Sequence, residues 1–264
     1  MEWWLAYLLI GAVVGFLAGL LGIGGGMIIV PLLVFVFSAK GFPETHLMHA
    51  ALGTAMATIL FTSISSVRAH HQRDGVDWKI ARAMAPGILL GGFVAPALAA
   101  QVPTRPLAMF FTAFMFYAAA QMFFRVQPKA TRDLPGGGGL FLAGGLIGIL
   151  SGLLAAGGAF LSIPFMTWCK VSLRRAIGTA AAIGFPVAAA GTLGYVLHGL
   201  RVERLPKYSL GFVYLPALGL IVVTSMLAAP LGARLTHALP VAKLRVVFAL
   251  LLLSIGLRML WALW

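Results

Sequence analysis

Long apolar blocks fill most of the chain, and short polar connections separate them. Inside a membrane no water is available to the backbone, so a segment that crosses must satisfy its own amides and carbonyls, as a helix does. About 20 residues of helix span a hydrocarbon core about 30 Å thick. The pattern predicts an all-α, polytopic membrane protein with blocks at about 5–38, 47–67, 79–101, 105–124, 138–169, 176–198, 208–234 and 240–263.

Composition supports this class. Hydrophobic residues make up 61% of the chain and charged residues only 9%, which leaves too little polar surface to coat a soluble protein of this size. The net charge of +13 comes from basic residues in short connections, a topogenic pattern, so we expect a lipid bilayer and no nucleic acid as partner. Residues 1–4 lack a signal-peptide n-region, and we expect the first block to be retained. With one cysteine, Cys169, we expect no internal disulfide, metal or cofactor.

A glycine-rich interruption occurs twice, at corresponding places. The first runs from Gly15 to Gly26 and reaches Pro31, and the second runs from Gly148 to Ala159 and reaches Pro164. Both lie in blocks too long for one straight helix. Paired broken helices of this kind are typical of the binding sites of transporters. Each block either turns back to the side where it began or splits into two crossing segments.

The later blocks also correspond between the two halves of the chain. We therefore predict two homologous repeats, 1–126 and 140–264, joined by a linker at 127–139, and each repeat holds a broken helix and three membrane helices. The matching pairs are Gly53-Thr54 with Gly178-Thr179, Pro86 with Pro216, Pro96 with Pro230, and Pro103 with Pro240.

The distribution of lysine and arginine indicates how the repeats are oriented. If each broken block crossed once, the repeats would be parallel and the two sides would carry eight and eleven basic residues, almost without bias. If it turns back or crosses twice, the repeats are inverted and the counts are thirteen and six, so the positive-inside rule favours inversion. This places Met1 outside and the richer set inside a cell's inner membrane: Arg68, Arg73, Lys79, Arg82, Arg125, Lys129, Arg132, Lys170, Arg174, Arg175, Arg234, Lys243 and Arg245.

These motifs resemble those of a known family. The kink at Leu20–Gly26, the arm ending in Pro31-Leu32-Leu33 and the downstream Ala51-Leu52-Gly53-Thr54 are similar to the TauE/SafE family of sulfite and organosulfonate exporters, and Ala176–Thr179 matches again. The resemblance covers essentially the whole chain and implies export of a small sulfur oxyanion. One departure is visible at 155–159, where Ala-Ala-Gly-Gly-Ala stands in place of a glycine-rich kink.

The breaks themselves predict an anion site. A helix that begins inside the membrane presents free amides and the positive end of its dipole, which hold anions without a formal charge. We expect the two arms to point toward each other near the midplane. The predicted binding residues are Gly24, Gly25, Gly26, Gly157, Gly158, Ala159, Thr54, Thr179 and His49.

Each of these assignments has a structural alternative. Either threonine could instead bond a carbonyl of its own helix, and His49 could be merely interfacial. Glycines spaced by four residues also allow membrane helices to pack closely. We assign six of them mainly to packing: Gly11, Gly15, Gly19, Gly144, Gly148 and Gly152.

Missing residue types narrow the function. All six acidic residues lie outside the apolar blocks or at their edges, whereas cation carriers need a carboxylate within the membrane. The blocks hold no Ser-His pair, paired carboxylates or metal cluster, so we expect no enzyme. The alternatives left open are transport of another small anion with proton coupling through His49, and a non-transporting scaffold or sensor. A homodimer is a possible assembly.

Overall fold

The computed structural model describes residues 3–21, 25–124, 130–203, 205–235 and 241–262. These residues form ten α-helices, one 3-10 turn and one short antiparallel pair of strands. The first half holds α1 (Trp3–Leu21), α2 (Gly26–Ala39), η1 (Glu44–His46), α3 (Leu47–His71), α4 (Trp78–Gln101) and α5 (Thr104–Phe123). The second half holds α6 (Gly137–Leu154), α7 (Ala159–Trp168), α8 (Leu173–Gly199), β1 (Ser209–Leu210), β2 (Val213–Tyr214), α9 (Leu215–Leu235) and α10 (Val241–Ala262).

Five of these helices, α3, α4, α5, α6 and α8, are long and apolar enough to cross a membrane within the described residues. The other five helices hold shorter apolar stretches, of 10–17 residues. Large hydrophobic side chains such as Leu9, Leu142 and Leu227 are exposed on the outside, as lipid contact requires. The predicted all-α, multi-pass fold is therefore confirmed.

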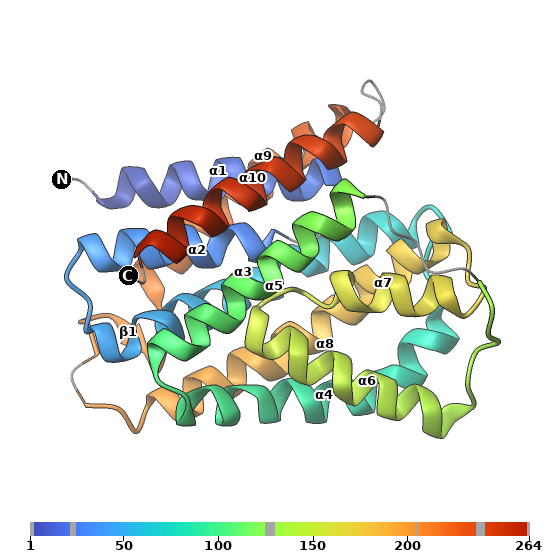
Figure 1. The fold of residues 1–264 in the computed structure, drawn as a ribbon, viewed down its shortest axis with the longest axis horizontal. Helices are drawn as coiled ribbons and strands as arrows, with labels where there is room; N and C mark the ends of the chain where they lie inside the picture. The colour runs from blue at the N-terminus through green and yellow to red at the C-terminus, as the bar shows by residue number, and fades with distance from the viewer. Residues whose placement is uncertain (1–2, 22–24, 125–129, 204, 236–240, 263–264) are drawn as a thin grey trace.

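The two long blocks break and turn back. In the first, the ring of Tyr7 near the start of α1 lies 6.4 Å from that of Phe37 near the end of α2. In the second, the amide of Arg132, just before α6, donates to the carbonyl of Trp168 at the end of α7 (3.3 Å). Figure 1 shows both pairs as hairpins whose second helix begins inside the molecule. Each block therefore returns to the end where it began, which excludes a single straight crossing and agrees with either a turn back or two crossing segments.

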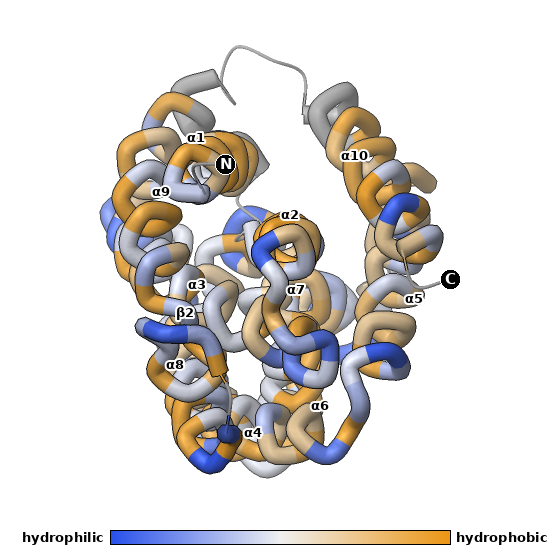
Figure 2. The backbone as a smooth tube through the Cα atoms, turned by 90° about the vertical axis from the view of Figure 1, so that its left-hand side faces the viewer, coloured by the Kyte–Doolittle hydropathy of each residue, from blue (hydrophilic) through white to orange (hydrophobic). Residues whose placement is uncertain are grey.

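The halves are interlocked through helix pairs that each join one half to the other. Helix α1 packs on α9, α6 on α4, α3 on α8 and α5 on α10. Seen along the long axis, α2 and α7 lie toward the middle and the other helices surround them (Figure 2). Helix α1 begins at one end of the long axis and α6 at the other (Figure 1). That the halves are inverted repeats of common origin stays a prediction.

Two details differ from expectation. Residues 209–214 form β1 and β2 in place of the first turns of a helix, because Gly211, with φ of 56°, turns the chain back on itself before α9. The match of Pro86 with Pro216 is also wrong in structural terms, since Pro86 lies inside α4 whereas Pro216 is the second residue of α9. Pro31 and Pro164 do correspond, each as the sixth residue of its helix.

Glycine faces bring the helix backbones close together. A Cβ on Gly148 would lie 2.6 Å from the Ile88 carbonyl oxygen of α4, and one on Gly11 would lie 2.6 Å from the Ile221 carbonyl oxygen of α9. Gly15, Gly144 and Gly152 make similarly close approaches. The packing role predicted for these five glycines is confirmed, and that of Gly19 stays a prediction.

The close contact of α6 with α4 can be tested by adding one methyl group. Gly148→Ala should lower the melting temperature, because the new Cβ overlaps the α4 backbone and overpacking costs about 1–3 kcal/mol. Gly138→Ala is the matched control on the same helix, since a Cβ there meets no atom within 4 Å. Thermal unfolding of the two purified variants in detergent measures the difference, and equal melting temperatures would contradict this packing.

Candidate functional site

Helix α2 begins inside the protein at a glycine. Gly25 caps the helix with φ of 57° and ψ of −17°, a left-handed conformation that glycine adopts without steric cost. Its carbonyl accepts hydrogen bonds from the amides of Ile28 (3.0 Å) and Ile29 (3.1 Å). A Cβ here would in addition lie 2.5 Å from Val14 of α1. This position therefore requires glycine for both conformation and space.

Helix α7 begins in the same way in the other half. Gly158 caps it with φ of 80° and ψ of −25°, and its carbonyl accepts from the amides of Leu161 (3.3 Å) and Ser162 (2.9 Å). The spacing from cap to proline is also the same, from Gly25 to Pro31 and from Gly158 to Pro164. The two breaks thus share one local design.

At each break, the first backbone amides of the following helix lack an acceptor among the described residues. Within the described chain, no residue accepts a hydrogen bond from the amides of Gly26 and Met27 at the start of α2, or from those of Ala159 and Phe160 at the start of α7. Such amides, added to the positive end of the helix dipole, are a ready anion site. Gly24 lies outside the described residues.

The two breaks meet across the halves. Gly26 lies directly against the carbonyl of Ala155, and a Cβ on Gly26 would overlap that oxygen. Ala155 ends α6 in a left-handed conformation with φ of 45°, which favours glycine and is uncommon for alanine. The carbonyl of a residue from the second half thus lies beside the positive end of α2 from the first.

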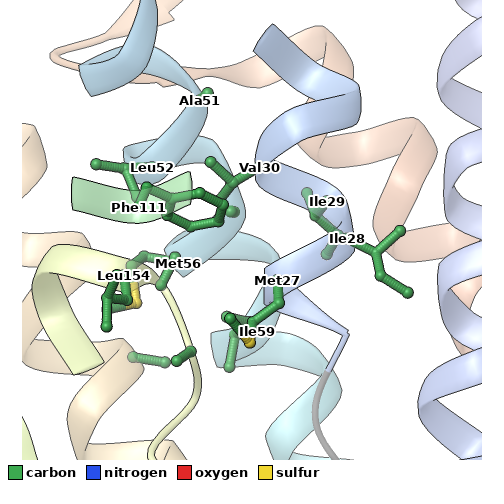
Figure 3. Close-up of a cluster of buried hydrophobic side chains, with 14 of the residues drawn as sticks. Met27, Ile28, Ile29, Val30, Ala51, Leu52, Met56, Ile59, Phe111 and Leu154 are labelled. Carbon is green, nitrogen blue, oxygen red and sulfur yellow. The ribbon is translucent and has the colours of Figure 1, made fainter. Parts of the chain in front are cut away.

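Apolar side chains close the space around this meeting point. Met27 of α2, Met56 and Ile59 of α3, and Leu154 of α6 are each at most 2% exposed. In the close-up, Met27 and Ile59 lie beside the first turn of α2, and Met56 and Leu154 lie farther from it on the same side (Figure 3). Ile59 also comes within 3.6 Å of the Cβ position of Gly157. The structure is therefore closed where the breaks meet.

Two serines beside the second break went unnoticed in the sequence. Ser151 lies in the last turn of α6 and Ser162 in the first turns of α7, and both are fully buried. Neither hydroxyl has a hydrogen-bond partner in the described part of the chain. Both hydroxyls are therefore free to donate a hydrogen bond to another acceptor. The signal was available, since both serines flank the interruption in an otherwise apolar block.

The structure places the two predicted threonines away from each other. The hydroxyl oxygen of Thr54 accepts from the amide of Tyr214 (3.0 Å), and that of Thr179 accepts from the amide of Asp77 (2.9 Å). Both side chains are fully buried. Neither makes the bond to its own helix that was the alternative, and contact with a substrate stays a prediction.

His49 is buried within the protein, with 3% of its surface exposed. Its Nε2 lies 2.8 Å from the carbonyl oxygen of Ala99 at the end of α4, and its ring stacks on Phe212 with centroids 5.2 Å apart. Its Nδ1 has no partner among the described residues. These contacts tie His49 to the strand pair and to the end of α4, and a role in binding stays a prediction.

Charges keep to the ends of the molecule. The acidic residues that the structure describes all lie in connections or in the 3-10 turn: Glu44, Asp74, Asp77, Asp133 and Glu203. The only ion pair among described residues, Lys170 with Asp133 at 2.8 Å, is exposed. The predicted placement of these five acidic residues is confirmed, so the breaks meet in surroundings without a described carboxylate.

Comparison with known proteins agrees with this architecture. The profile of the family described as "Sulfite exporter TauE/SafE" matches residues 7–259. A "Probable membrane transporter protein" of Haemophilus influenzae is 36% identical over 254 residues, which cover 96% of each chain. A "Probable membrane transporter protein MJ0441" of Methanocaldococcus jannaschii is 25% identical over 263 residues, covering 96% of this chain and 94% of that one.

A "Probable membrane transporter protein YdhB" of Bacillus subtilis is 27% identical over 246 residues, covering 90% of this chain and 92% of that one. No solved structure gives a significant match. The family match extends over nearly the whole chain, through both broken helices and both glycine faces. The chain belongs to the TauE/SafE sulfite exporter family of membrane transporters.

Proposed function

We propose that this protein is a secondary transporter, and not an enzyme, that exports a small sulfur oxyanion such as sulfite or a short organosulfonate like sulfoacetate. The substrate binds between the starts of α2 and α7, near the middle of the membrane. The observation that carries the proposal is the meeting of two helix breaks, Gly26 against Ala155, in surroundings without a described carboxylate. The description of the matched family supports the choice of sulfur oxyanions.

The proposed site consists mainly of backbone. The amides of Gly26, Met27, Ala159 and Phe160 supply donors, and the glycine caps of both helices let an oxyanion come close. In the closed structure the Ala155 carbonyl lies beside the start of α2. An oxygen of the substrate would take its place, since both carry negative charge toward the same dipole. Such donors recognise the oxyanion group and leave its organic tail free to vary.

Ser151 and Ser162 complete the site in this proposal. Their buried hydroxyls need an acceptor, and a sulfite or sulfonate oxygen provides one. Ala159, Ser162 and Met166 lie on the buried face of α7, so Ser162 follows directly behind the free amides. The two breaks would therefore hold the anion unequally, with hydroxyl donors on the second.

Orientation and energy source follow from charge. The end of the molecule where α3 stops and α4 begins brings together basic connections, and there Arg174 donates to the carbonyl of Arg73 (3.0 Å). By the positive-inside rule we assign this end to the cytoplasm of a cell with an inner membrane, and the start of α1 to the outside. Moving one negative charge outward gains about 2.3 kcal/mol per 100 mV, so no coupling ion is required.

The serine donors give a test that leaves the fold intact. Ser162→Ala and Ser151→Ala should each raise the KM for sulfite or sulfoacetate about 10- to 100-fold, because a hydrogen bond to a charged group contributes about 1.5–3 kcal/mol. The measurement is uptake into proteoliposomes over a range of substrate concentrations. Ser225→Ala is the matched control, since that buried hydroxyl already bonds the Val222 carbonyl at 3.1 Å. Equal KM values for all three variants and the wild type would contradict the proposed site.

If no ion is coupled to transport, the membrane potential alone should set how the substrate is distributed across the membrane. With no coupled ion, a potential of 100 mV should distribute a singly charged sulfonate about 50-fold toward the positive side of proteoliposomes. The distribution should not respond to an imposed pH gradient at zero potential. Accumulation that follows the pH gradient instead would favour the proton-coupled alternative. If no sulfur oxyanion moves at all, the result would favour a non-transporting scaffold or sensor.

A further inference from the structure

Two contacts between the halves follow one pattern at opposite ends of the molecule. At the first, Thr54 accepts a hydrogen bond from the amide of Tyr214, and a Cβ on the neighbouring Gly53 would lie 2.7 Å from the carbonyl oxygen of Phe212. At the second, Thr179 accepts from the amide of Asp77, and Gly178 lies against the carbonyl of Gly75. In both contacts, the threonine hydroxyl binds an amide, and the glycine lies against the carbonyl of the residue two positions before that amide. We call these contacts the Thr54 clasp and the Thr179 clasp.

Both clasps join one half of the chain to the other. Thr54 belongs to α3 in the first half, and the segment that it holds leads directly into α9 of the second. Thr179 belongs to α8 in the second half, and its segment leads directly into α4 of the first. A movement that separates α3 from the start of α9, or α8 from the start of α4, must therefore break or strain a clasp.

The clasps lie on either side of the meeting point of the two breaks. Ile59 contacts the Cβ positions of Gly26 and Gly157, and Gly184 lies close to the Gly157 carbonyl. Ile59 and Gly184 each follow the clasp threonine of their own helix by five residues, about 7 Å along an α-helix. Because α3 and α8 begin at opposite ends of the long axis, the order along it is Thr54 clasp, breaks, Thr179 clasp (Figure 1).

The surroundings of the two clasps differ. At the Thr54 clasp, Phe212 stacks on His49, and the ring of Tyr214 lies 5.2 Å from that of Phe42 and 5.6 Å from that of Phe37. Lys40 donates to the Tyr214 hydroxyl. At the Thr179 clasp, Asp77 lines an open cavity of about 350 Å³ together with Lys170, Ser172 and Arg175. One clasp is sealed by aromatic rings, whereas the other opens onto a hollow lined by one carboxylate, Asp77, and two cations, Lys170 and Arg175.

We propose that the two clasps are the gates of the transport path, which open one at a time and are both shut in this structure. This inference rests on the transport function proposed above. Opening the Thr179 clasp admits the anion from the hollow beside Arg175 to the breaks, and opening the Thr54 clasp releases it at the opposite end. In alternating access of this kind, the path opens on one side at a time around a fixed site.

Side-specific labelling tests the gates without any substrate. The reporter is Ile183→Cys, a 1% exposed residue that contacts the Gly158 position, in a Cys169→Ala background and in sealed vesicles of known orientation. Thr179→Val removes the hydroxyl but keeps the shape, and should raise labelling by a membrane-impermeant maleimide about fivefold from the basic end alone. Thr54→Val should raise labelling similarly from the other end alone.

Matched variants separate a gate from general loosening. Thr58→Val removes a buried hydroxyl that bonds the Thr54 carbonyl of its own helix at 2.9 Å, and should leave labelling unchanged. Thr179→Ser and Thr54→Ser keep the acceptor and should restore wild-type labelling. Unchanged labelling in both valine variants, an equal rise from both sides, or a raised KM with unchanged labelling would overturn the proposal. Sided labelling without sulfite movement would keep the gates and reject the substrate.

Discussion

The structure depends on a constraint that the membrane places on the backbone. A helix that stops and restarts within the hydrocarbon exposes amides and carbonyls that water cannot reach, and such groups are tolerated only where protein or a cavity surrounds them. The chain meets this condition twice by turning α2 and α7 inward and enclosing them with other helices (Figure 2). Each break faces the other, so the positive end of α2 lies against the Ala155 carbonyl. In the proposed function, the amides that this enclosure protects are the ones that bind the anion.

Enclosure of this kind requires very close helix packing. Gly11 and Gly15 bring α1 onto α9, while Gly144 and Gly148 bring α6 onto α4. In both cases the helix that leads into a break is fixed to the other half of the chain. The arm that follows each break, α2 or α7, is less extensively packed against the helix before it. The glycine faces therefore hold these helix pairs tightly together. The clasps at Thr54 and Thr179 each depend on a single hydrogen bond, which can break and form again.

The sequence predicted the helices well because membrane helices carry their pattern locally. Apolar length located α3, α4, α5 and α8 to within a few residues, and glycine spacing identified the packing faces around Gly15 and Gly148. It could not decide whether a broken block turns back, since that depends on contacts such as Tyr7 with Phe37. The partners of Thr54 and Thr179 were equally out of reach, because each lies over 100 residues away in the chain. Ser151 and Ser162 became meaningful only once burial showed that their hydroxyls lack partners.

The two breaks share a backbone design but not a side-chain chemistry, and this difference bears on function. The register that aligns Gly25 with Gly158 and Pro31 with Pro164 places Ala18 opposite Ser151 and Ile29 opposite Ser162. One break is therefore lined by apolar groups where the other carries hydroxyls, although both begin with a left-handed glycine cap. A site with the same donors on both breaks would bind an anion equally through either half. An unequal site keeps the anion on the second break while either gate opens, so that both gates can act on one bound substrate.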